Sequence, residues 1–180
     1  MKFPAKPALA VLILFAACLF ACTQSATPDE AGFKNAVLKP FSDTLHADTF
    51  KVRIVGDSPK DMKIAFQISA HTGKVIYAVD IKASDLFSNY DATINLDKKK
   101  NQLRFLREEA KNFLHDENFM EPAVTGEEEP DEHVPDKAFF EELRKTAFNG
   151  FSYRLGKEKK IYIAWSAREH KVKPYYVCCE

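Results

Sequence analysis

Glycine is scarce in this chain, with only six residues in 180. Phosphate-binding and dinucleotide-binding loops both need several glycines at fixed spacing, and neither pattern occurs. The Gly-x-Ser-x-Gly and His-Glu-x-x-His motifs of hydrolytic enzymes are absent from the sequence as well. The sequence therefore assigns no catalytic, cofactor-binding or metal-binding residue, and no cofactor is expected.

The chain also lacks an excess of charge of either sign, because 26 basic residues balance 26 acidic ones. If residues 1–21 are removed, Lys2 and Lys6 are lost with them and the balance barely changes. A near-neutral chain gives no electrostatic reason for binding nucleic acid or a wide anionic surface. No nucleic-acid partner is predicted.

The longest apolar run, residues 8–20, is too short for a comfortable membrane span. As a helix it reaches roughly 20 Å, whereas the hydrocarbon core of a bilayer is about 30 Å thick. Lys2 and Lys6 precede it, and a basic start followed by a short apolar run is typical of an export signal. Residues 1–21 are therefore predicted to be a signal peptide.

The end of this run resembles the lipobox of bacterial lipoprotein precursors, in which an aliphatic residue and two small residues precede a cysteine. Leu19, Ala21 and Cys22 match the pattern, whereas Phe20 is bulkier than usual for its position. The resemblance implies that Cys22 carries the lipid, including acyl chains such as palmitate, and becomes the first residue of an exported protein. Two or three acyl chains hold a protein firmly, so the predicted location is the cell membrane or the outer membrane.

Other interpretations of this segment stay open. Cys22 is an ordinary cysteine if cleavage is conventional, although no small-x-small pair is well placed before Thr27. The segment is an uncleaved anchor if cleavage fails. Residues 15–18 form a second, poorer box ending in Cys18, because its first position is aromatic. Some lipoproteins are retained at the inner membrane by an Asp after the lipidated cysteine. This chain has Thr23 at that position, so the sequence does not fix which membrane holds the protein.

Residues 22–36 are predicted to be a flexible tether, and residues 37–180 a single domain. Apolar alternation predicts six strands at 49–55, 63–69, 75–81, 151–155, 161–165 and 175–179, and a further strand at 92–96. The 63–69 and 75–81 strands are expected to form a hairpin. Ile76 and Ala78 give the second of these a second apolar face, which favours a central position, and Pro174 favours an edge for the last strand.

Two helices are predicted between the strands. A stripe at helical spacing runs through residues 97–115, formed by Leu103, Leu106, Ala110, Phe113 and Leu114. Asp136 can cap a second helix that ends at Asn149 and Gly150 and buries Phe139, Phe140, Leu143 and Ala147. The expected fold is α+β, an antiparallel sheet of about five to six strands with two helices packed on one side.

Residues 116–136 hold nine acidic residues, no Lys or Arg, and three prolines. We interpret this segment as a long, solvated acidic loop, since like charges repel one another. A calcium site is the alternative, but the Asp-x-Asp-x-Asp-Gly spacing of such sites is missing. The negative charge of the loop allows it to bind a basic partner.

Cys178 and Cys179 are adjacent, so they cannot join distant parts of the chain. The favoured interpretation buries one of them as a small hydrophobic residue while the other points away. A vicinal or intermolecular disulfide is an alternative, and so is a soft-metal site with His170. Tyr175 and Tyr176 are either core residues or an exposed platform for a carbohydrate or a protein.

The favoured hypothesis is a lipid-anchored, non-catalytic cell-envelope protein that binds a protein or glycan partner or supports an assembly. It depends on the anchor at Cys22, the tether and the lack of a catalytic motif. One alternative is an exported hydrolase-like enzyme whose residues meet only in the folded chain, which predicts a pocket with convergent histidine and carboxylate groups. The other is a carrier of a small ligand or a metal ion.

Overall fold

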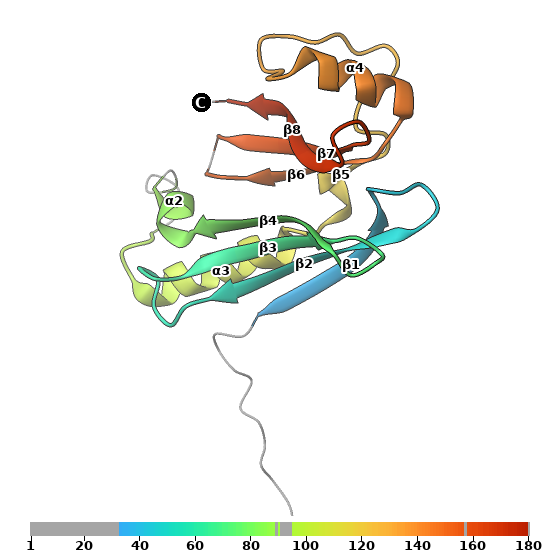
Figure 1. Cartoon of the computed structure of the whole chain (residues 1–180). Coiled ribbons are helices and arrows are strands. Elements are labelled where there is room, and N and C mark those ends of the chain that lie inside the picture. The colour runs from blue at the N-terminus through green and yellow to red at the C-terminus, as the bar shows by residue number, and fades with distance from the viewer. Residues whose placement is uncertain (1–32, 89, 91–94, 157, 180) are drawn as a thin grey trace, which may run out of the picture.

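The structure is a computed structural model and describes residues 33–88, 90, 95–156 and 158–179. It contains two antiparallel sheets, each of four strands joined in sequence order. Sheet A is formed by β1 (Lys34–Pro40), β2 (Ala47–Val55), β3 (Lys63–Ser69) and β4 (Val75–Lys82). Sheet B is formed by β5 (Phe119–Met120), β6 (Gly150–Arg154), β7 (Lys160–Ser166) and β8 (Lys171–Cys178). The helices are α2 (Ala83–Phe87), α3 (Lys99–Asn112), η2 (Asp116–Asn118) and α4 (Lys137–Thr146) (Figure 1).

The α+β class is confirmed, but the prediction of one sheet of five to six strands is wrong. Apolar alternation fixes which side chains share a face of a strand, and it carries no information on which strands are neighbours. In β6, Phe151 and Tyr153 face one way and Gly150 and Ser152 the other, and all four are buried. A strand covered on both faces belongs inside a second layer, and sheet B is that layer.

The two sheets share one hydrophobic core. The inner face of sheet A presents Phe50 and Phe66, and sheet B contributes Phe151 and Tyr153. Phe66 lies 5.1 Å from Phe151 and 4.9 Å from Phe113, which follows α3, measured between ring centres. Both α3 and sheet B therefore pack on the same face of sheet A.

Helix α4 packs elsewhere, on the opposite face of sheet B. It buries Phe139, Phe140 and Leu143 in a second cluster with Ala164 of β7 and Tyr175 of β8. The predicted arrangement of both helices on one side of one sheet is therefore wrong. The layers are sheet A, then α3 beside sheet B, then α4 (Figure 1).

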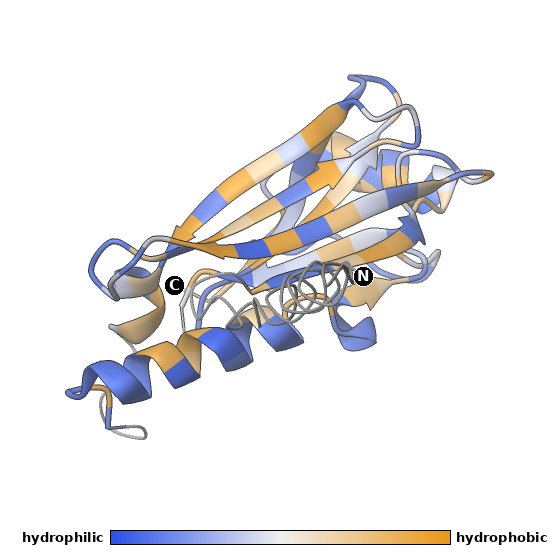
Figure 2. Cartoon of the chain, turned by 90° about the horizontal axis from the view of Figure 1, so that it is seen from below, coloured by the Kyte–Doolittle hydropathy of each residue, from blue (hydrophilic) through white to orange (hydrophobic). Residues whose placement is uncertain are grey.

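Both predicted long helices are present. Asp136 caps α4 as predicted, since its carboxylate accepts a hydrogen bond from Phe139 N at 3.0 Å. The helix ends earlier than predicted, because Ala147 adopts the left-handed conformation of a C-cap, with φ of 52°. Helix α3 keeps its polar residues on the outer face and its apolar residues toward the core (Figure 2). It also buries Phe105, which the predicted stripe did not include.

The strand predictions differ from the structure at the edges of the sheets. β4 was expected to be central but lies at the edge of sheet A, next to β8. β8 lies at the edge of sheet B, as Pro174 indicated. β1 begins at Lys34, inside the segment expected to be tether. The strand expected at 92–96 falls mainly outside the described residues.

A direct hydrogen bond joins the two sheets between β4 and β6. The hydroxyls of Tyr77 in β4 and Tyr153 in β6 lie 2.6 Å apart. Burial raises the pKa of both phenols, so both stay neutral and one donates to the other. This bond fixes the polar atoms of two large side chains inside the shared core.

Candidate functional site

The lipidation residue predicted from the sequence, Cys22, lies outside the described residues. Within them, no helix is long and apolar enough to cross a membrane.

The proposed site of His170 with the cysteine pair is wrong. His170 precedes β8 and Cys178 ends it, and a strand rises about 3.3 Å per residue, so the two lie some 25 Å apart. Cys178 and Cys179 form a vicinal disulfide, in which Cys178 is half-buried and Cys179 is exposed, so neither is buried. The favoured interpretation, with one cysteine buried as a small hydrophobic residue, is therefore wrong as well.

The acidic loop has the exposed carboxylates that the sequence predicted, but it is attached to the domain. Ala123, Val124 and Val134 are buried in the cluster beneath α4, and Val177 N donates to His133 O at 3.0 Å. In the described part of the chain, no three residues of this loop come together as a metal-binding group. The calcium alternative therefore gains no support from the geometry.

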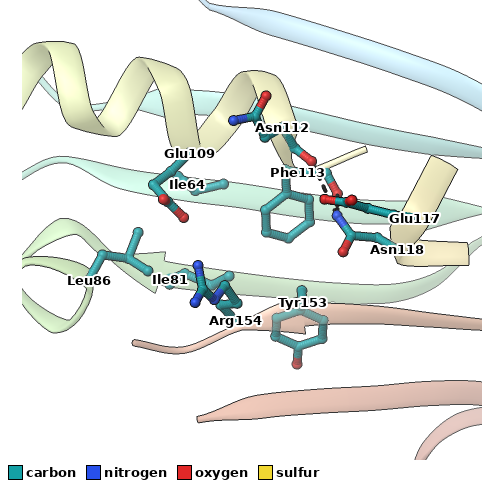
Figure 3. A pocket seen from close by; sticks show the side chains of 10 residues that line it. All are labelled: Ile64, Ile81, Leu86, Glu109, Asn112, Phe113, Glu117, Asn118, Tyr153 and Arg154. Carbon is teal, nitrogen blue, oxygen red and sulfur yellow. Dashed lines mark hydrogen bonds between the residues drawn. The ribbon is translucent and has the colours of Figure 1, made fainter. Parts of the chain in front are cut away.

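A small hollow lies between α3 and the ends of β4 and β6. Its volume is about 170 Å³, and Ile64, Ile81 and Phe113 form its apolar wall. Glu109 from α3 and Arg154 from β6 face each other across it (Figure 3). A water molecule takes about 30 Å³, so the hollow has room for only a few waters or a very small ligand.

Glu109 gives a pH-dependent prediction. Burial raises the pKa of its carboxyl, and the nearby Arg154 opposes this shift. Because the folded chain holds this proton more tightly than the unfolded chain, stability falls as pH rises from the ordinary pKa of glutamate through the raised one. Glu109→Gln removes that loss.

We therefore expect Glu109→Gln to raise the melting temperature at pH 7 and to have little effect near pH 4, measured by thermal denaturation. Glu108→Gln is the matched control, because its side chain is an exposed neighbour on the same helix. An equal rise in the melting temperature at both pH values would contradict a raised pKa of Glu109.

The outer face of sheet A carries a larger hollow, of about 480 Å³. Its centre is open because three small side chains form its floor: Ala36, Ala65 and Ala78. Lys51 and Arg53 are exposed beside it. The charged side chains at this hollow are long and exposed, so they do not form a preorganised binding site.

The third hollow, which we call the tyrosine pocket, combines aromatic walls with carboxylates and has a volume of about 350 Å³. Tyr162 comes from β7, Tyr175 and Tyr176 from β8, and Phe140 from α4. The acidic loop closes one side and contributes Glu128, Glu129 and Asp131. The pocket therefore forms where the acidic loop crosses the edge of sheet B.

A register shift in sheet B brings two adjacent tyrosines to this pocket. Tyr162 pairs with Tyr176, and the next residue of β7, Ile163, pairs with Pro174. Tyr175 is left without a partner on β7, which is the geometry of a β-bulge. Strict alternation would send Tyr175 and Tyr176 to opposite faces of the sheet, whereas both line the same pocket.

The tyrosine rings form a corner. Tyr162 and Tyr176 are nearly perpendicular, at 89°, with ring centres 5.5 Å apart, and Tyr162 and Tyr175 lie 6.1 Å apart at 68°. Lys160 Nζ lies 5.2 Å from the centre of the Tyr162 ring, so this corner already contacts one cation of the chain itself.

Two carboxylates of the pocket lack a cationic partner. Arg144 pairs with Glu129 at 3.2 Å, whereas no Lys, Arg or His side chain of the described residues forms a salt bridge with Glu128 or Asp131. Glu128 accepts a hydrogen bond from Thr125 N at 2.7 Å, and Asp131 accepts one from His133 N at 2.9 Å and another from the Tyr176 hydroxyl at 3.1 Å. These hydrogen bonds hold both carboxylates in place, and all of them come from neutral donors.

The hydroxyl of Tyr175 also has no partner among the described residues, and its side chain lines the pocket. Tyr175 is 4% exposed, and its hydroxyl makes no hydrogen bond within the described part of the chain. Burial raises its pKa, so the phenol stays neutral and able to donate. Gly150 makes room for this hydroxyl, because a Cβ at position 150 would lie 2.8 Å from it. The hydroxyl is therefore able to donate a hydrogen bond to a ligand or to a water molecule in the pocket.

No known protein family, curated protein or solved structure matches this chain.

The sequence indicated separate parts of this pocket but did not indicate that they lie together. Tyr175 and Tyr176 were considered as a platform, and the acidic loop as a surface for a basic partner. Nothing in the local pattern placed residues 128–131 over β8. None of the three hollows contains a histidine, so none has the convergent histidine and carboxylate groups that the enzyme alternative predicts.

Proposed function

We propose that the protein is a lipid-anchored, non-catalytic cell-envelope protein that binds an organic cation, an alkylammonium group, in the tyrosine pocket. The observation that carries the binding function is a corner of perpendicular tyrosine rings beside two carboxylates without cationic partners. The resemblance of residues 19–22 to a lipobox supports the anchor, and the chain after residue 22 supplies the tether.

The chemistry of the pocket favours a cation with apolar surface. A ring face attracts a cation by about 0.5–2 kcal/mol, and the effect grows as the cation loses water. The charges of Glu128 and Asp131 add to this attraction and, being exposed, weaken with salt. A neutral sugar can stack on tyrosine rings, but it would leave both charges uncompensated, so the glycan partner considered from the sequence is disfavoured.

Calorimetry with tetramethylammonium chloride tests this proposal in the full-length protein in nonionic detergent. For so small a probe we expect a dissociation constant of about 1 mM, which corresponds to −4.1 kcal/mol. tert-Butanol is similar in shape and uncharged, and we expect it to bind at least about tenfold more weakly. Equal binding of the two probes, or binding of neither, would refute the cation site.

The double variant Glu128→Gln, Asp131→Asn keeps the shape of the pocket and removes its two free charges. We expect it to lower the affinity for tetramethylammonium about tenfold. The matched control is Glu127→Gln, Glu132→Gln, which removes two exposed charges from the same loop at positions that do not line the pocket. If both pairs weaken binding equally, the net charge of the loop, and not the pocket, attracts the probe.

A further inference from the structure

Two loops at one end of sheet A bring together histidines that lie far apart in the sequence. The connection between β1 and β2 carries Asp43 and His46, and the turn between β3 and β4 carries His71. Because β2 pairs with β3 as far as Thr49 and Ser69, the residues just beyond that pair lie side by side. Both connections emerge at the same end of the sheet (Figure 1).

The three side chains present converging ligand atoms. His46 Nδ1 lies 3.0 Å from Asp43 Oδ2, and the rings of His46 and His71 stack with centres 4.4 Å apart. One ligand atom from each of the three residues lies within 4.8 Å of the others. In the described part of the chain this is the one such group of three.

A buried carboxylate holds the two loops together. Asp48 is fully buried and accepts a hydrogen bond from Ser42 N at 2.6 Å and another from His71 N at 3.0 Å. Ser42 immediately precedes Asp43, so one carboxylate fixes the backbone on both sides of the cluster. Asp43 is fixed in turn by a hydrogen bond of 2.7 Å from Leu45 N. The backbone positions of the three residues are therefore set in advance.

From this arrangement we infer that Asp43, His46 and His71 form a binding site for a divalent transition-metal ion such as Zn²⁺. Two imidazoles and one carboxylate are ligands that suit zinc and its neighbours in the periodic table, whereas calcium prefers oxygen atoms alone. When the ion binds His46 through Nδ1, it takes the place of the hydrogen bond to Asp43, and the neutral imidazole carries its one proton on Nε2.

The distances are compatible with such a site. Metal–ligand bonds of about 2.1 Å place two ligand atoms of one ion roughly 3.0–4.2 Å apart. Asp43 and His46 are already at that spacing. No separation in the group exceeds 4.8 Å, so reaching the roughly 3.4 Å spacing of a tetrahedral site needs a closure of at most about 1.4 Å, and the exposed side chains of His46 and His71 can turn to provide it. Water completes the coordination on the open side.

Calorimetry with ZnCl₂ tests the site in the full-length protein, purified with a tag that contains no histidine and kept without thiol reductant. We expect one Zn²⁺ per chain and no comparable heat with CaCl₂. His46→Ala and His71→Ala each remove one ligand and should weaken the binding by about 10–100-fold. Both side chains are exposed, so the variants should keep the fold, which circular dichroism checks.

His115→Ala is the matched control, because His115 is exposed and also lies near a carboxylate, that of Glu117, at 4.0 Å. It should leave the affinity for Zn²⁺ unchanged. In imidazole nitrogen spectra, Zn²⁺ should move the signals of His46 and His71 and leave those of His115 in place. Absence of stoichiometric binding, or equal weakening by His115→Ala, would overturn the site.

Discussion

Phe66→Ala is expected to lower the free energy of unfolding by about 3–5 kcal/mol, a large part of the stability of a domain of this size. Phe66 is 1% exposed and lies at the junction of three elements. Its ring centre lies 6.1 Å from Phe50 in sheet A, 5.1 Å from Phe151 in sheet B and 4.9 Å from Phe113 after α3. Removing the ring leaves a cavity in the hydrophobic core to which both sheets contribute.

Denaturant unfolding followed by both circular dichroism and Trp165 fluorescence measures this effect. Trp165 lies in sheet B, so the two signals compare the whole chain with one sheet. We expect coincident transitions, as for one cooperative unit. Leu45→Ala is the control, because Leu45 is 86% exposed, and its cost should stay within about 0.5 kcal/mol. A loss from Phe66→Ala as small as that of the control would show that the sheets do not share a core.

Cys22→Ala is expected to abolish lipidation completely, because only a thiol can receive the thioether-linked lipid that a lipobox implies. Mass spectrometry of the N-terminal peptide measures this directly. The wild-type peptide should begin at residue 22 and carry the mass of two or three acyl chains, whereas the variant should carry none and keep residues 1–21. Loss of several buried acyl chains removes about 0.8 kcal/mol of membrane affinity for each methylene group.

Cys18→Ala is the matched control, since Cys18 ends the second, poorer box. It should leave the acylated peptide unchanged. Acyl mass that disappears with Cys18→Ala and persists with Cys22→Ala would place the anchor at Cys18. An unmodified N-terminus at another residue would remove the anchor from the account.

Local patterns predicted the elements of this fold well. Alternation located six of the strands, and the Asp136 cap located the start of α4, because these signals depend on residues close together in the chain. The division into two sheets was missed because it depends on which faces meet. Ser152 is an example. It is buried although it faces away from sheet A, because α4 and its cluster cover the opposite face of sheet B.

Neither candidate site was predictable from spacing alone. The tyrosine pocket needs the bulge that turns Tyr175 and Tyr176 to one side, and the pairing of Ile163 with Pro174 that creates it is a property of two strands together. The Asp43, His46 and His71 cluster needs the register of β2 with β3. The histidines lie 25 positions apart in the sequence, so no helical or hairpin spacing indicated them.

The central claim, that the tyrosine pocket binds a cation, is tested most directly by aromatic NMR spectra of the full-length protein during a titration with tetramethylammonium chloride. The account predicts that the ring signals of Tyr162, Tyr175 and Tyr176 move together along one saturating curve. The signals of Tyr77 and Tyr153, which lie between the sheets and do not line the pocket, should stay in place. Pocket signals that do not move, or that move equally with tert-butanol, would contradict the claim.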